Sequence, residues 1–172
     1  MRRSCFVAAV LVPVLMLAAV TKPKRYKHPL GFSFELPAGW NVEDAAVGST
    51  LLPPGVKVDP NREDNAEVYA VWSVEDDQST EKDYIEGLRQ GFRKSSIKID
   101  REGDLEVFSS PGKPGVIYTF DFVHPKRNIA CRIRVFSVTA KGKPILLVAT
   151  GEREKLAQRD RLLREVARSF EW

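Results

Sequence analysis

The sequence predicts a single α+β domain built on antiparallel strands and amphipathic helices. Near the end of the chain, three strand-like segments follow one another through short turns, at residues 116–123, 129–139 and 145–150. Strands joined by such short turns pair in antiparallel fashion. Segments with apolar residues at helical spacing come before and after them, at about 80–92 and 152–169. With 172 residues, of which 43% are hydrophobic, the chain is long enough for one domain with its own core.

The first twenty residues have the pattern of an export signal. Arg2 and Arg3 supply positive charge, and an uncharged apolar run follows from Cys5 to Val20. The run is short for a membrane-spanning helix, and Pro13 interrupts it. We expect residues 1–20 to be a signal peptide or an N-terminal membrane anchor, with a buried first helix as the alternative. The protein is then exported, and is periplasmic, extracellular or tethered to the membrane.

Residues 21–29 are polar and basic, and we expect a linker that precedes a single domain at residues 30–172. Four cations lie in this segment: Lys22, Lys24, Arg25 and Lys27. Basic residues beside an anchor are attracted to anionic lipid. The linker is therefore a candidate contact with an anionic membrane surface, and a solvated tether is the alternative.

The domain opens with the run GFSFELPAGW, residues 31–40. Its alternation of apolar and polar residues predicts a strand, and Pro37 and Gly39 predict a turn that directs Trp40 back onto it. Further strands are expected at 49–52 and at 66–75, with a polar loop between them. We expect Trp40 and Trp72 to be core anchors.

A helix is expected to begin after Ser79-Thr80, because Ser and Thr are favoured N-caps. Gly87 and Gly91 lie within it, and we expect them to permit close packing on the sheet. Two strands, at 97–101 and 105–109, are predicted to follow. The last helix, 152–169, has acidic residues early and arginines late, as the helix dipole favours.

The register of the hairpin formed by 116–123 and 129–139 follows from burial. A four-residue turn, 125–128, gives an apolar face on which the pairs are Tyr118–Val135, Phe120–Ile133 and Phe122–Cys131. The opposite face pairs Asp121 with Arg132 and Thr119 with Arg134. A slip by one residue would place arginines among phenylalanines, so burial selects this register. Lys141-Gly142 is expected to form the next turn, since Gly adopts positive φ readily.

Two of these segments resemble a known family. The run GFSFELPAGW resembles the first strand and turn of the PsbP-like, or MOG-type, group, which includes bacterial envelope proteins of unknown function. Residues 166–170, VARSF, resemble the end of that group's terminal helix. The resemblance spans about residues 31–170. It implies an antiparallel β-sheet flanked by helices, in an α/β/α sandwich, and it implies no particular activity.

Composition and motifs exclude several classes of function. Without Arg2 and Arg3 the chain carries 25 basic and 23 acidic residues, a balance that does not favour nucleic acid. The histidines, His28 and His124, are too few for a His-rich metal site. The spacing of Asp59, Asn61 and Glu63 matches the start of a calcium loop, but the glycine that such a loop needs is replaced by Asp64, so we expect a solvated loop. We therefore expect no metal and no cofactor.

One charged cluster is a candidate binding site, formed by Asp121, Arg132, Arg134 and Thr119. It would bind an anion or a partner, and the alternative is cross-strand pairing that only stabilises the sheet. No nucleophile or acid–base constellation emerges, and Cys131 alternates with isoleucines as a small core residue. We expect a non-enzymatic, exported envelope domain that binds a protein partner or a ligand. A small-molecule or lipid carrier is the alternative, and a hydrolase using Asp121 is less favoured.

Overall fold

A computed structural model describes residues 23–45, 48–56, 67–73, 80–103, 105–110 and 113–172. The expected leader at 1–20, Lys22 and the calcium-like spacing at 59–64 lie outside these residues. Among the described residues, no helix has the length and apolar composition needed to cross a bilayer.

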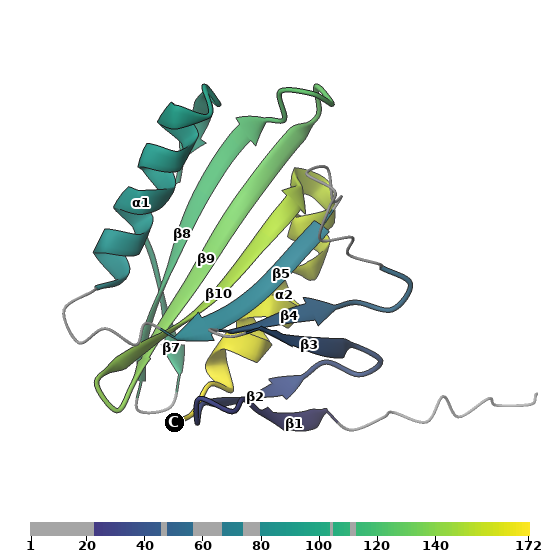
Figure 1. Cartoon of the computed structure of the whole chain (residues 1–172), viewed down its shortest axis with the longest axis vertical. Coiled ribbons are helices and arrows are strands. Elements are labelled where there is room, and N and C mark those ends of the chain that lie inside the picture. Colours follow the sequence, from purple (N-terminus) through teal and green to yellow (C-terminus); the bar gives the residue numbers. More distant parts are fainter. Residues whose placement is uncertain (1–22, 46–47, 57–66, 74–79, 104, 111–112) are drawn as a thin grey trace, which may run out of the picture.

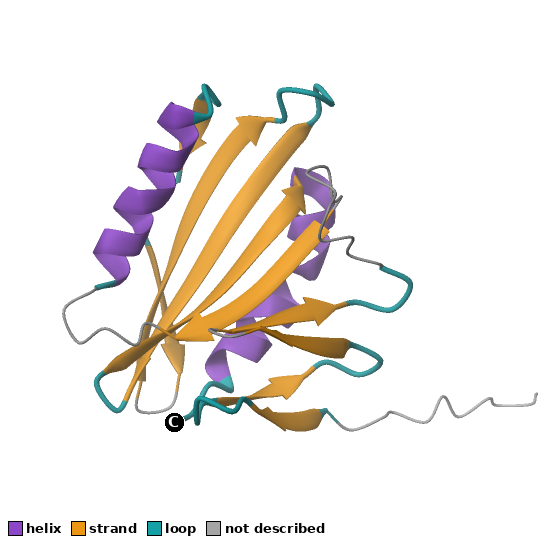
Figure 2. Ribbon diagram, viewed as in Figure 1, coloured by secondary structure: helices purple, strands orange, loops and turns teal. Residues whose placement is uncertain are grey.

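One large sheet dominates the molecule (Figures 1 and 2). Its strand order is β3-β4-β5-β10-β9-β8-β6, with β7 also paired to β8, and every pairing described is antiparallel. The strands are β3 (Asn41–Ala45), β4 (Gly48–Leu52), β5 (Glu67–Ser73), β6 (Ile99–Glu102), β7 (Glu106–Ser110), β8 (Lys113–Val123), β9 (Ala130–Ala140) and β10 (Lys143–Glu152). Valine, isoleucine and aromatic residues alternate along the central strands, as half-buried strands require.

Two helices lie on opposite faces of this sheet. Helix α2 (Arg153–Arg168) packs on β9, β10 and β2 (Ser33–Leu36). Helix α1 (Glu81–Lys94) buries Ile85 and Phe92 in a second apolar cluster. This cluster includes Phe120, Ile133 and Leu146 on the sheet face opposite α2. The expected α+β class with an antiparallel sheet is therefore right. The sheet makes up most of the fold, and α1 and α2 are the helices of the described residues.

The expected linker is wrong for residues 24–28, which belong to the domain. Strand β1 (Lys24–Lys27) pairs with β2 (Ser33–Leu36) in a separate two-stranded sheet. His28 follows it and is 3% exposed. Its Nδ1 accepts a hydrogen bond from the Leu30 backbone N–H, and its ring stacks on Phe32. The charged residues of β1 suggested a tether. The segment is a strand because it pairs with β2, and not because of its own apolar content.

The predicted register of the β8–β9 hairpin is confirmed at every pair, including Asp121 opposite Arg132 and Thr119 opposite Arg134. The turn at Lys141-Gly142 is also confirmed, since both residues have positive φ, 50° and 78°. The strands expected at 97–101 and 105–109 exist as β6 and β7, and both pair with β8 at successive positions along it. The short polar strand β3 was not predicted.

The two motifs that suggested the family lie together in space. The backbone of Ser33 in β2 pairs with that of Glu171, and Phe34 contacts Phe170 edge to face at 6.0 Å between ring centroids. The Ser169 hydroxyl also accepts a hydrogen bond from the Glu35 backbone N–H at 2.7 Å. Strand β2 is thus held by residues 169–171.

Candidate functional site

Helix α1 is fixed to the sheet at both of its ends. At the N-terminus, Thr80 and Asp83 form a capping box, and Glu81 accepts hydrogen bonds from Ser137 (2.6 Å) and Tyr118 (3.3 Å). Near the C-terminus, Phe92 packs against Phe120 and Phe122, with ring centroids 6.1 and 5.3 Å apart. The partners in these contacts lie on β8, except Ser137 of β9.

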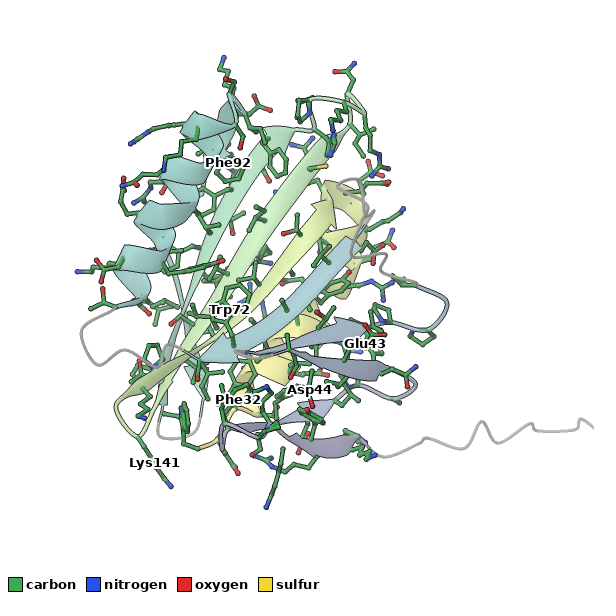
Figure 3. All side chains as sticks on the ribbon, in the orientation of Figure 1. Phe32, Glu43, Asp44, Trp72, Phe92 and Lys141 are labelled. Carbon is green, nitrogen blue, oxygen red and sulfur yellow. The ribbon has the colours of Figure 1, made fainter. Side chains whose placement is uncertain are left out.

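The other side of α1 borders an apolar groove with a volume of about 790 Å³. Strands β5 and β9 form its floor through Trp72 and Ile133. Figure 3 shows Phe92 on α1 and, lower in the view, Trp72 on the sheet; both line the groove. The rest of the wall comes from α1 and the residues next to it: Thr80, Asp83, Tyr84, Gly87, Leu88, Gly91, Ser95 and Ile97.

Gly87 and Gly91 do not bring the helix close to the sheet, contrary to our expectation. A Cβ atom built on either residue would meet no atom within 4 Å among those described. Together with Asp83 and Ser95 they recur every four residues along the helix, so they form one stripe that faces the groove. Their missing side chains leave space that larger residues would fill.

Few polar groups line the groove. Ser73 pairs with Ile145 and alternates with Trp72 along β5, so its side chain lies on the α2 face of the sheet and not in the groove. Asp83 Oδ2 accepts hydrogen bonds from the Thr80 backbone N–H and from the Thr80 hydroxyl, both at 2.7 Å. These hydrogen bonds hold the pKa of Asp83 below its usual value. Burial raises the pKa of Tyr84 to about 12, so its phenol stays neutral.

The predicted binding cluster lies on the opposite face of the sheet, toward α2. Asp121 is held by Arg132 through two hydrogen bonds, Nε to Oδ1 at 2.6 Å and Nη2 to Oδ2 at 2.9 Å. The Asp121 side chain is only 5% exposed. The Arg132 guanidinium holds the pKa of this carboxyl below its usual value. Thr119 is half-buried beside this pair, and its backbone carbonyl accepts from the Gly103 N–H at 2.8 Å.

Arg134 is buried and paired with acidic groups from two other elements. It donates to Asp160 of α2, and to Glu106 of β7 at 3.2 Å. Arg164 of α2 contacts the same two carboxylates. The structure therefore brings the four predicted residues together on one face, but the charges of Asp121, Arg132 and Arg134 are engaged within the protein.

Other singled-out residues divide between core and groove. Trp40 is buried as expected, edge to face with Tyr69 of β5 at 5.1 Å between ring centroids. Trp72 is half-buried, contacts Tyr84 of α1 at 5.2 Å and lines the groove, so it is not the core anchor that we expected. Cys131 is buried, which raises the pKa of its thiol. His124 Nδ1 accepts backbone N–H groups of the following turn.

Sequence reasoning missed the groove, although two signals were present. Two glycines four residues apart on one helix face leave an uncovered stripe, and Trp72 occupies the end of a strand that leads toward that helix. Neither signal gives the separation between helix and sheet, which depends on how the large side chains on the other side of α1 pack. The described residues contain no group of three or more His, Cys, Asp or Glu suited to a metal ion.

Comparisons with protein-family models and with curated proteins find no match. Among solved structures, the chain is similar to the solution structure of cyanobacterial PsbP from Synechocystis, with a TM-score of 0.57 and 18% identity over 92% of this chain and 98% of that one. A protein of unknown function from Pseudomonas aeruginosa aligns with a TM-score of 0.42 and 9% identity, over 84% of this chain and 93% of that one. At 18% identity the likeness to PsbP concerns architecture, and on that evidence the chain has the PsbP-like fold.

Proposed function

We propose that this protein is a non-enzymatic binding domain that holds an apolar small molecule in the groove between α1 and the sheet. The observation that carries the proposal is the groove itself, about 790 Å³ in volume and lined by large apolar side chains. Ligand sites of this size with few polar groups are typical of small-molecule binding proteins. Among the functions considered from the sequence, this favours the small-molecule or lipid carrier.

The chemistry of the groove favours an aliphatic ligand over a peptide. A peptide carries backbone N–H and C=O groups, each of which needs a partner when it is buried. The middle of the groove, around Gly87, Leu88, Gly91 and Ile133, offers apolar surface. An aliphatic chain buries there without leaving polar groups unpaired, and it removes apolar area from water.

A catalytic role for Asp121 is not supported by its surroundings. A general acid or base works best with a pKa near the operating pH. The bidentate contact with Arg132 lowers the pKa of Asp121 and occupies both carboxylate oxygens. The ion pair fits the alternative that we gave for this cluster, which is stabilisation of the sheet.

We place this domain in the cell envelope, exported or tethered at its N-terminus, on the basis of the charge and apolar pattern of residues 1–20. Lys24 and Lys27 are exposed on β1 and are available to an anionic membrane surface, whereas Arg25 pairs with Glu171. In this proposal the fold works as a three-layer α/β/α sandwich in which the α1 layer covers the sheet incompletely and leaves the groove.

A protein partner in the envelope is a second candidate. The edge strand β7 and the residue before it expose two large apolar side chains, Leu105 (53%) and Val107 (73%). An edge strand with apolar side chains is a surface on which another chain pairs. This surface is separate from the groove, since neither residue lines it.

Binding is tested with Nile red, a neutral dye that fluoresces in apolar surroundings. The dye should bind the full chain, and Gly91→Leu should weaken that binding by about tenfold or more, because the new side chain enters the groove. The matched control is Gln90→Leu, which places the same side chain on the exposed side of α1.

The glycine substitution also separates a loss of binding from a loss of folding. Glycine is a poor helix former, so Gly91→Leu should be at least as stable as the natural chain in urea denaturation. If both leucine variants bind Nile red as well as the natural chain does, the groove is not the binding site and the proposal is wrong.

A further inference from the structure

The two ends of the groove offer no positive charge to a ligand. No Lys, Arg or His side chain lines the groove among the described residues. Where α1 begins, Asp83 lines the groove, and its hydrogen bonds with Thr80 favour the ionised carboxylate. Where α1 ends, Ser95 lines the groove, whereas Arg93 and Lys94 of the last turn do not. An anionic head group would therefore find no cation to pair with at either end.

The end beside Asp83 also carries two aromatic rings. Trp72 of β5 (Figure 3) and Tyr84 of α1 both line the groove, with ring centroids 5.2 Å apart and ring planes at 72°. Both side chains are half-buried, so part of each remains accessible. Tyr84 follows Asp83 in the chain, which places the carboxylate and the rings at the same turn of α1. An aromatic face attracts a cation, most strongly in Trp, so the rings and the carboxylate favour the same sign of charge.

The positive end of the α1 dipole does not cancel this preference. The dipole amounts to about half an elementary charge, whereas Glu81 and Asp83 place two carboxylates in the first turn. Glu81 is turned toward β8 and β9, where it accepts hydrogen bonds from Tyr118 and Ser137. Asp83 is therefore the carboxylate that a ligand in the groove would meet.

Between its two ends the groove is apolar. Gly87, Leu88 and Gly91 of α1 line this part, opposite Ile133 of β9. At about 1.5 Å per residue, the helix advances roughly 18 Å from Asp83 to the residue that caps its C-terminus. A molecule that fills the groove therefore has a long apolar body in addition to its head group.

We propose that the ligand is a cationic amphiphile, an aliphatic chain that lies along the groove with an ammonium head group beside Asp83, Trp72 and Tyr84. This inference rests on the proposed function, because it specifies what the same groove binds. A carboxylate next to aromatic faces is suited to an ammonium group, whether primary or quaternary. The inference excludes fatty acids and other acidic lipids as the preferred ligands.

The test compares three probes that share one aliphatic chain and differ in charge: dodecyltrimethylammonium, dodecanol and dodecanoate. Each competes with Nile red for the full chain at neutral pH, below its solubility limit and its micelle concentration. Dodecyltrimethylammonium should bind about tenfold more tightly than dodecanoate. The chain carries a net charge of +4, which by itself attracts the anion, so non-specific attraction would give the opposite order.

Asp83→Asn removes one negative charge from the groove and keeps the side-chain size. It should weaken dodecyltrimethylammonium binding by about two- to fivefold and leave dodecanol binding unchanged. The matched control is Glu86→Gln, which removes the same charge from α1. Glu86 pairs with Arg89 and Arg93 and does not line the groove, so its substitution should leave the binding of all three probes unchanged.

Trp72→Leu provides the second arm, since it keeps an apolar side chain and removes the ring. It should weaken dodecyltrimethylammonium binding by about two- to fivefold and dodecanol binding by less than about twofold.

Two results would overturn the inference while the proposed function stands. The first is dodecanoate binding to the natural chain at least as tightly as dodecyltrimethylammonium. The second is a loss of dodecyltrimethylammonium binding in Asp83→Asn that is no larger than the loss in Glu86→Gln, or no larger than the accompanying loss of dodecanol binding. If no probe displaces Nile red and Gly91→Leu has no effect on the dye, the proposed function fails instead.

Discussion

At the scale of single residues, the same type of side chain serves different purposes on the two faces of the sheet. On the α2 face, Asp121 is buried, and the Arg132 guanidinium balances its negative charge. On the α1 face, Asp83 is exposed and ionised beside an apolar groove. Both carboxyls have a lowered pKa, the first through an arginine and the second through Thr80. The arginine pair stabilises the fold, whereas the exposed carboxylate caps helix α1.

The Asp121–Arg132 pair predicts how stability depends on pH. An aspartate in the unfolded chain has a pKa of about 3.9, and the folded value for Asp121 is lower. Its stabilising contribution is therefore present above about pH 4 and is lost as the pH falls through the folded value. In urea denaturation, Asp121→Asn should lower the free energy of unfolding at neutral pH by about 1–3 kcal/mol and reduce its acid dependence.

Asp100→Asn is the control for this substitution, since Asp100 is exposed on β6. It should change the free energy of unfolding by less than about 0.5 kcal/mol at neutral pH. If the free energy of unfolding falls equally with pH in the natural chain and in Asp121→Asn, the Asp121–Arg132 pair does not contribute to stability.

At the scale of elements, prediction from sequence succeeded where a strand or helix buries an apolar face of its own. The register of β8 and β9 was predictable because any slip buries Arg132 or Arg134 among phenylalanines. Strand β1 was missed because its residues are mostly charged and exposed and it is defined by pairing with β2. The groove was missed because its width depends on the distance between α1 and the sheet, which no local pattern gives.

Strand β1 provides a prediction of its own. A chain that begins at Pro23 retains β1 and His28, whereas a chain that begins at Pro29 lacks both. The shorter chain loses the β1–β2 ladder and the stacking of His28 on Phe32. Its free energy of unfolding should therefore be at least about 2 kcal/mol lower. Equal urea midpoints for the two chains would mean that residues 24–28 act as a tether after all.

At the scale of the whole molecule, the apolar core between the sheet and α2, the larger of the two clusters, joins the two ends of the described chain. Phe32 and Phe34 of the opening motif pack with Phe170 and Trp172 of the closing one. Helix α2 covers this core on the sheet face opposite the groove. The groove and this core therefore lie on opposite faces, so groove substitutions such as Gly91→Leu do not touch this core.

Phe170 is fully buried, and Phe170→Ala should lower the free energy of unfolding by about 3–5 kcal/mol. Arg161→Ala, on an exposed position of α2, is the matched control and should cost less than about 0.5 kcal/mol. A loss of less than about 1 kcal/mol in the free energy of unfolding of Phe170→Ala would show that the packing of Phe170 against Phe34 does not hold the core together.

The pairing of Ser33 with Glu171 also determines when this chain is able to fold. The Glu35 N–H and the Ser169 hydroxyl that receives it lie 134 residues apart. During synthesis β2 leaves the ribosome long before its backbone partner Glu171 and before Phe170. Contacts of such long sequence separation form late and slow folding. The core is therefore completed only once residues 169–172 have left the ribosome, and until then the nascent chain remains open along β2.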